Sequence, residues 1–173
     1  WAALAAVASG KRAAVLDLDY HHGNGTQDVL EGREGLSFAS LHADPRTDYP
    51  FFWGHAEENG GNIRNWPLPR GTEADAYEAA LDEACAWVAG RSPELLVVSF
   101  GADTWEGDPI SHFRLKTEDY ARLGQRLAAL GLPTLVVMEG GYAVEALGAN
   151  VAGFLSGFSL LHLGGAVAGS ASR

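Results

Sequence analysis

The sequence contains little cysteine, few basic residues and no long hydrophobic run. Its single cysteine, Cys85, excludes a framework of disulfides within the chain and favours a reducing, cytoplasmic compartment. No apolar run is long enough to cross a membrane. Lys and Arg number 12 against 22 Asp and Glu, and the net charge of −10 argues against nucleic acid or a membrane as the partner and favours cationic ligands.

The rest of the composition is that of one globular domain, because 47% of the residues are hydrophobic and 20% are charged. Short apolar runs alternate with segments of helical periodicity, which predicts an α/β fold with a mostly parallel sheet and helices on both faces. Thr72 and Thr117 stand where they would cap two of the helices. We expect strands at residues 13–18, 36–41, 63–68, 95–100 and 134–138, helices at 2–9, 27–31, 73–90, 118–130 and 143–156, and a loosely ordered tail at 159–173.

Strand 13–18 carries acidic and histidine side chains at every second position where it ends. Asp17, Asp19 and His21 therefore point toward one side of the chain. Asp103 closely follows strand 95–100, and in parallel α/β sheets ligands bind beyond the carboxyl ends of the strands. Asp19, His21 and Asp103 together offer three ligands to a divalent metal ion and leave one position open, which is the arrangement of a catalytic metal site.

Two further segments bring aromatic residues toward the same edge of the sheet. Strand 134–138 is followed by Glu-Gly-Gly-Tyr, and the phenol of Tyr142 beside a metal can donate a hydrogen bond to the oxyanion formed when water attacks a carbonyl. Residues 42–62 form a long loop without periodicity, which is typical of a lid or binding loop. Its aromatic residues either line a substrate channel or pack as a small second core. The channel interpretation assigns Tyr49, Phe51, Phe52, Gly140 and Gly141.

Four motifs resemble, in their order, those of the histone deacetylase superfamily. They are Asp-Leu-Asp-Tyr-His-His-Gly-Asn-Gly-Thr, Ser-Leu-His, Gly-Ala-Asp-Thr-x-x-Gly-Asp-Pro and Glu-Gly-Gly-Tyr. The segments 51–55 and 110–113 are similar to its bacterial acetylpolyamine amidohydrolase branch. The resemblance implies a zinc-dependent amidohydrolase of the arginase–deacetylase fold, which removes acetyl groups from an acetylated polyamine or acetyl-lysine. It implies that Asp19, His21 and Asp103 bind the zinc and that Tyr142 is the oxyanion donor.

The same resemblance implies a structural potassium site, formed by Asp17, Asp19, His21, Ser40 and Leu41 through side chains and backbone carbonyls. It also implies that the strands lie in the order 134–138, 95–100, 13–18, 36–41, 63–67. The metal ligands then stand where the sheet reverses its direction of growth. Members of this branch can pair through loops, so the resemblance is compatible with a homodimer.

The chain departs from the family at the residues that move protons. The family has a Pro-Gly-His-His motif upstream of the first ligand strand, and its tandem histidines act as general base and acid; no such motif is present here. His21 is already a metal ligand, and His22 points to the opposite side. We therefore expect residues 1–158 to be the C-terminal part of one deacetylase catalytic domain whose N-terminal part is missing, and the chain alone to be inactive.

Other interpretations of the same residues stay open. One is a metal-binding but catalytically incomplete fragment. Another is a phosphatase of the haloacid dehalogenase type, with Asp17 as nucleophile and Asp19 as acid/base, although that family needs Thr or Val where this chain has His21. Arginase-like enzymes share the fold but use two metal ions and further aspartates. The sequence does not distinguish zinc from iron, nor does it identify the acetylated amine.

Overall fold

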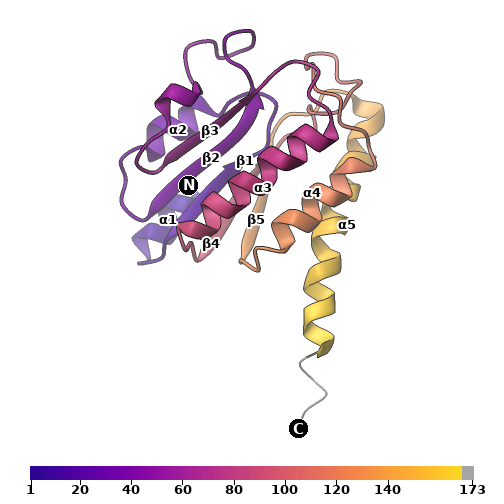
Figure 1. The fold of residues 1–173 in the computed structure, drawn as a ribbon. Helices are drawn as coiled ribbons and strands as arrows, with labels where there is room; N and C mark the ends of the chain where they lie inside the picture. The colour runs from indigo at the N-terminus through magenta and orange to yellow at the C-terminus, as the bar shows by residue number, and fades with distance from the viewer. Residues whose placement is uncertain (169–173) are drawn as a thin grey trace.

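The computed structural model describes the backbone of residues 1–168 and the side chains of residues 1–159. At its centre is a parallel sheet whose strands lie in the order β3-β2-β1-β4-β5 (Figure 1). The predicted strand order is confirmed. The strands are β1 (Ala13–Asp17), β2 (Leu36–Ala43), β3 (Ile63–Leu68), β4 (Leu95–Phe100) and β5 (Thr134–Met138).

Helices cover both faces of the sheet, as the alternating pattern predicted. The helices are α1 (Ala2–Ala8), α2 (Asn24–Leu30), α3 (Ala74–Gly90), α4 (Asp119–Ala128) and α5 (Val144–Ala168). Leu16 and Val98 belong to the core beneath α3, α4 and α5, whereas Val15 and Phe38 belong to a second core beneath α1 and α2. In Figure 1 α3 runs across the front of the sheet. Strands covered on both sides must be apolar throughout, which explains the continuous apolar runs in the sequence.

The two predicted helix caps are wrong. α3 begins after Glu73 and α4 after Glu118, and neither residue caps its helix with a side-chain hydrogen bond. The hydroxyl of Thr72 donates instead to the carbonyl of Pro69 (2.6 Å), which closes the turn before α3. At the start of α4 it is the carboxylate of Asp119 that accepts a backbone hydrogen bond, from the N–H of Lys116 (2.7 Å).

Two helices differ in length from the prediction. α2 begins at Asn24 rather than at residue 27, and α5 continues to Ala168 rather than ending near residue 156. No proline interrupts the sequence after residue 133, so nothing in the segment forces α5 to stop early. Part of the tail expected at 159–173 is therefore helical, and residues 169–173 lie outside the described part of the chain. None of the described helices is long and apolar enough to span a membrane.

The two edges of the sheet are unlike each other. β3 carries Pro67, which lacks an N–H and is tolerated at an edge. β5 forms the other edge, and its apolar residues Leu135, Val137 and Met138 are 43%, 38% and 44% exposed. An edge strand that exposes apolar side chains is a surface on which other polypeptide packs.

Candidate metal centre

The loops that follow β1, β4 and β5 meet at one edge of the sheet. The chain leaves β1 toward β2 and β3 on one side and then crosses to β4 and β5 on the other, so β1 and β4 flank the point where the strand order reverses. A crevice forms at such a point, because the loops after the two neighbouring strands diverge. Asp19 and His21 follow β1, Asp103 follows β4, and Gly140 and Tyr142 follow β5.

The three residues predicted as metal ligands lie together. One ligand atom from each of Asp19, His21 and Asp103 lies within 4.8 Å of the other two. The Nδ1 atom of His21 is 3.2 Å from Oδ2 of Asp103 and 3.5 Å from Oδ1 of Asp19. Backbone N–H groups orient both carboxylates: that of His21 donates to Asp19 (2.8 Å), and that of Tyr20 donates to Asp103 (3.0 Å).

The ionisation of this cluster shows how strongly it attracts positive charge. Hydrogen bonds to Asp103 and Asp19 raise the pKa of His21 to about 9. Burial, followed by the charge of Asp19, raises the pKa of Asp103 to about 6 although His21 opposes the shift. Burial also raises the pKa of Asp19, but hydrogen bonds from His21 and Gly140 outweigh it and lower that pKa overall. A divalent cation would replace the proton that His21 carries between the two carboxylates.

Glycines leave room around these ligands. A Cβ atom added to Gly101 would lie 2.6 Å from Oδ1 of Asp103, and one added to Gly140 would lie 2.5 Å from Oδ2 of the same residue and 2.6 Å from Oδ2 of Asp19. All three distances are shorter than a Cβ atom can adopt, so a larger residue at either position would displace the carboxylates. Two carboxylates and one imidazole in a space kept free of side chains fit a divalent metal ion of the zinc type.

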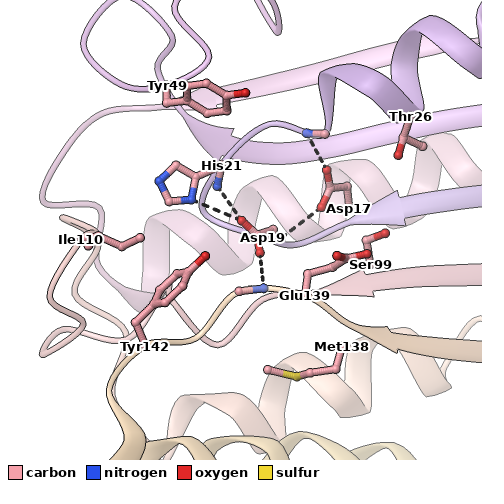
Figure 2. A pocket seen from close by; sticks show the side chains of 12 residues that line it. Asp17, Asp19, His21, Thr26, Tyr49, Ser99, Ile110, Met138, Glu139 and Tyr142 are labelled. Carbon is pink, nitrogen blue, oxygen red and sulfur yellow. Dashed lines mark hydrogen bonds and ion pairs between the residues drawn. The ribbon is translucent and has the colours of Figure 1, made fainter.

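Tyr142 stands beside the cluster at the rim of a cavity of about 650 Å³. Figure 2 shows its phenol pointing toward His21 and Asp19. Partial burial and the charges of Asp103 and Asp19 raise the pKa of Tyr142, so its hydroxyl stays protonated and able to donate at neutral pH. The cavity is lined by Asp17, Asp19, His21, Gly23, Thr26, Tyr49, Ser99, Ile110, Met138, Glu139, Gly140 and Tyr142.

The predicted channel residues divide into two groups. Tyr49 and Gly140 line the cavity, and the ring of Tyr49 lies 6.3 Å from that of His21. Phe51, Phe52 and Gly141 are not among the residues that line it. Phe52 is 83% exposed, because the loop directs it into solvent rather than toward the metal ligands. The sequence analysis did not assign other residues of the cavity wall to the site, among them Thr26 and Ile110, because the motifs that contain them do not show which of their side chains face the cavity.

Comparison with known proteins assigns the family. The profile of the histone deacetylase domain matches residues 2–158. The chain belongs to the histone deacetylase domain family. It is 54% identical over 153 residues to acetylpolyamine amidohydrolase 1 of Pseudomonas aeruginosa, covering 86% of this chain and 44% of that protein. It is 48% identical to the acetylpolyamine amidohydrolase of Mycoplana ramosa, covering 85% of this chain and 45% of that protein.

Solved structures agree with this assignment. The crystal structure of acetylpolyamine aminohydrolase from Burkholderia pseudomallei superposes with a TM-score of 0.89 at 38% identity, covering 92% of this chain and 48% of that one. A histone deacetylase homologue from Aquifex aeolicus superposes with a TM-score of 0.82 at 26% identity, covering 89% and 44%. The fold is therefore the one predicted, and the chain spans a little under half the length of the curated relatives that it matches.

Next to the predicted metal ligands of this deacetylase-family chain, Asp17 is buried, and no cationic side chain among the described residues pairs with it. Its carboxylate accepts the N–H of Asp19 (3.1 Å) and of Gly23 (3.0 Å). Burial, and then the charge of Asp19, raises the pKa of Asp17 well above its ordinary value. The Oγ atom of Ser40 is 3.4 Å from this carboxylate.

The neighbouring histidine decides where the hydroxyl proton of Ser40 goes. Nε2 of His42 donates to the carbonyl of Gly54 (2.8 Å), so the neutral ring offers the lone pair of Nδ1 to Ser40, 2.8 Å away. Burial lowers the pKa of His42 to about 3, which keeps the ring neutral. The single hydroxyl proton of Ser40 is thus shared between His42 at 2.8 Å and Asp17 at 3.4 Å, and the longer contact leaves the carboxylate of Asp17 only weakly compensated, which favours a cation beside it.

His21 is the only histidine among residues 1–159 that lines the cavity. His22 lies on the far side of its strand end, with its ring 4.4 Å from that of His42 and its Nδ1 atom 3.2 Å from Ser40. Burial lowers the pKa of His22 to about 4, so it stays neutral. Neither histidine faces the place where a substrate would enter.

Proposed function

We propose that this protein is a zinc-dependent amidohydrolase that removes the acetyl group from a small cationic acetylated amine, either a polyamine or acetyl-lysine. The observation that carries the proposal is the cluster of Asp19, His21 and Asp103 at the cavity that Tyr142 also lines, in a chain 54% identical over 153 residues to an acetylpolyamine amidohydrolase. The phosphatase alternative has no support left, because the family is that of the deacetylases.

In the proposed mechanism each residue has one task. Asp19, His21 and Asp103 would hold the zinc, which supplies Lewis acidity that polarises the acetyl carbonyl and lowers the pKa of water. Tyr142 donates its phenolic hydrogen to the oxygen of that carbonyl as negative charge develops on it. Glu139 brings an acidic side chain to the cavity wall, which favours a substrate that carries a cationic amine.

We also propose a potassium ion between Asp17 and Ser40, completed by backbone carbonyls near Asp19, His21 and Leu41. The position of the Ser40 hydroxyl supports it, because this group is closer to His42 than to Asp17 and so compensates the carboxylate only weakly. Such an ion would balance the charge of Asp17 and stabilise the strand end that carries the zinc ligands.

A catalytically incomplete, metal-binding role is the second candidate. The observation in its favour is that, of the side chains described, none but His21 offers an imidazole to the cavity. Hydrolysis needs a group that accepts a proton from water and a group that protonates the departing amine. In the first candidate these groups come from a part of the protein outside the present 173 residues.

The direct test is an assay of the protein expressed from its full-length reading frame. Acetylputrescine and an acetyl-lysine peptide are offered in parallel, before and after treatment with a zinc chelator. We expect turnover of at least one substrate, its loss with the chelator and its return with added zinc. Absence of turnover on both substrates by the zinc-loaded protein would contradict the first candidate and leave the second.

In that full-length protein, Tyr142→Phe is expected to lower kcat by about 10²–10³-fold, the usual cost of removing one oxyanion donor. The phenol makes no hydrogen bond with any described residue, so its removal should leave the fold and the zinc content unchanged. Turnover and metal content are measured on the same preparation. Near-normal kcat would mean that Tyr142 is only a residue of the cavity rim.

Zinc affinity should depend on pH in two ranges. With the pKa of His21 near 9 in the metal-free site, zinc must displace one proton below that pH, so the apparent affinity should rise about tenfold per unit from pH 6 to pH 9. Below about pH 6 Asp103 is protonated as well, and the dependence should steepen. Competition with a chelator of known affinity measures this, and Tyr142→Phe should give the same slope. An affinity independent of pH between 6.5 and 8.5 would place the metal elsewhere.

A further inference from the structure

Asp108 lies in the long loop between β4 and α4, outside the metal ligands and the cavity wall. Its carboxylate is buried, with the residue only 6% exposed. One oxygen accepts the N–H of Ile110 (3.0 Å), and the other accepts the N–H of Tyr142 (2.8 Å) from the loop after β5. Ile110 and Tyr142 both line the cavity, so one carboxylate joins two of its walls.

The residue before Tyr142 has a backbone conformation that is open mainly to glycine. Gly140 is fixed by two hydrogen bonds, because its N–H donates to Asp19 (2.7 Å) and its carbonyl accepts the N–H of Ala102 (2.8 Å). Gly141 follows with φ at 142°, a conformation that only glycine adopts readily. Tyr142 is 51% exposed, and its phenol has no hydrogen-bond partner among the described residues. The next residue, Ala143, is buried and its carbonyl accepts the N–H groups of Ala146 and Leu147 at the start of α5. Between Gly141 and Ala143, the bond to Asp108 is the hydrogen bond that holds the backbone of Tyr142.

Asp108 is itself held in a rigid turn. Its N–H donates to the carbonyl of Trp105 (3.0 Å), and Glu106 N–H donates to the carbonyl of Leu115 (2.8 Å). The indole of Trp105 covers Gly107 so closely that a Cβ atom there would lie 2.6 Å from Cη2. Within residues 1–159 no cationic side chain pairs with Asp108, so its charge is directed at the two backbone donors, and such charge-assisted hydrogen bonds are strong.

We propose that Asp108 is the positioning residue of Tyr142: it fixes the tyrosine backbone after the Gly141 turn and so holds the phenol over the metal centre. This inference rests on the proposed function, in which Tyr142 donates to the oxyanion. Asp108 does not line the cavity; it reaches the proposed site through the backbone of Tyr142 at one oxygen and through that of Ile110 at the other, and of these two residues only Tyr142 is proposed to take part in the reaction. Because an oxyanion donor acts in the transition state, loss of its position lowers kcat and leaves KM nearly unchanged.

The test is a double-mutant cycle in the zinc-loaded, full-length protein with Asp108→Ala, Tyr142→Phe and both together. Asp108→Ala is expected to lower kcat by about 10–10²-fold, the cost of misplacing a catalytic group by about 1 Å. In protein that already carries Tyr142→Phe, adding Asp108→Ala should lower kcat by less than about twofold, because the donor that Asp108 positions is absent. The proposal would be overturned if Asp108→Ala lowered kcat equally with and without Tyr142→Phe, or if its main effect were a higher KM.

Asp119→Ala is the matched control. Asp119 is equally buried (5% exposed) and likewise accepts a backbone N–H, that of Lys116, but it lies at the start of α4 rather than against Tyr142. Asp119→Ala should therefore lower the thermal stability of the protein and leave its kcat unchanged. Should Asp108→Ala not fold, Asp108→Asn keeps the volume and one acceptor oxygen, and it is run through the same cycle with the same criterion.

A measurement without turnover separates this proposal from the proposed function. In protein labelled with 3-fluorotyrosine, the ¹⁹F resonance of Tyr142 is assigned by its disappearance in Tyr142→Phe. We expect Asp108→Ala to move this resonance toward its value in the unfolded chain, and Asp119→Ala to leave it in place. A resonance unmoved by Asp108→Ala would overturn the positioning role even in a protein that hydrolyses neither substrate, whereas inactivity of the unmodified protein contradicts only the proposed function.

Discussion

The 173-residue chain, folded and loaded with zinc, is expected to hydrolyse acetylputrescine and acetyl-lysine at least about 10³-fold more slowly than the same chain joined to the N-terminal half of its Pseudomonas aeruginosa relative. General acid and base groups each contribute about 10²–10⁴-fold to such reactions. The family resemblance assigns this work to tandem histidines upstream of β1. No histidine described here replaces them, because His22 and His42 are buried on the other side of the strand ends and stay neutral.

The same experiment tests the exposed edge of the sheet. β5 exposes Leu135, Val137 and Met138, and the added half should cover them. We therefore expect the isolated chain to bind a hydrophobic dye and to aggregate, and the joined protein to do neither. Zinc content is measured for both, so that a missing metal is not mistaken for missing acid–base groups. Comparable turnover by the two proteins would show that the proton-transfer argument is wrong.

Replacing Asp103 with alanine should lower zinc affinity by more than about 10²-fold. Removing a residue that merely supports a metal ligand lowers metal affinity by about 10–10²-fold. Asp103 is proposed to bind the metal directly, so its removal should have a larger effect. The two ligands left, Asp19 and His21, rarely suffice to hold zinc against water. The buried position of Asp103 leaves no room for a nearby side chain to take over, since Gly101 and Gly140 surround it.

Elemental analysis and chelator competition measure the metal in Asp103→Ala, and circular dichroism checks the fold. Asp119→Ala serves as the control, because it removes a carboxylate of similar burial far from the cavity and should retain one zinc. A full equivalent of zinc held by Asp103→Ala with unchanged affinity would show that the metal, if bound, lies at another site.

Much of this protein could be predicted from local pattern. Buried parallel strands must be apolar along their whole length, so the runs at 13–18 and 95–100 were recognisable without any structure. The alternation of Asp17, Asp19 and His21 follows from the two-residue period of an extended chain, and the carboxyl ends of parallel strands share one edge. These regularities are properties of the backbone, and for that reason the ligand cluster could be proposed from spacing and motif alone.

Tertiary structure decided what depends on partners distant in the sequence. Thr72 stands one residue before the N-cap position of α3, where its carbonyl accepts the N–H of Arg114 from the loop after β4. Phe52 faces solvent while Ile110 lines the cavity, which depends on how two loops are placed rather than on their composition. Asp108 reaches the N–H of Tyr142 across 34 residues, and only the adjacency of β4 and β5 brings the two loops together. A hydrogen bond of this kind leaves no periodic trace in the sequence, because the position of its acceptor is set by the sheet and not by the residues on either side of it.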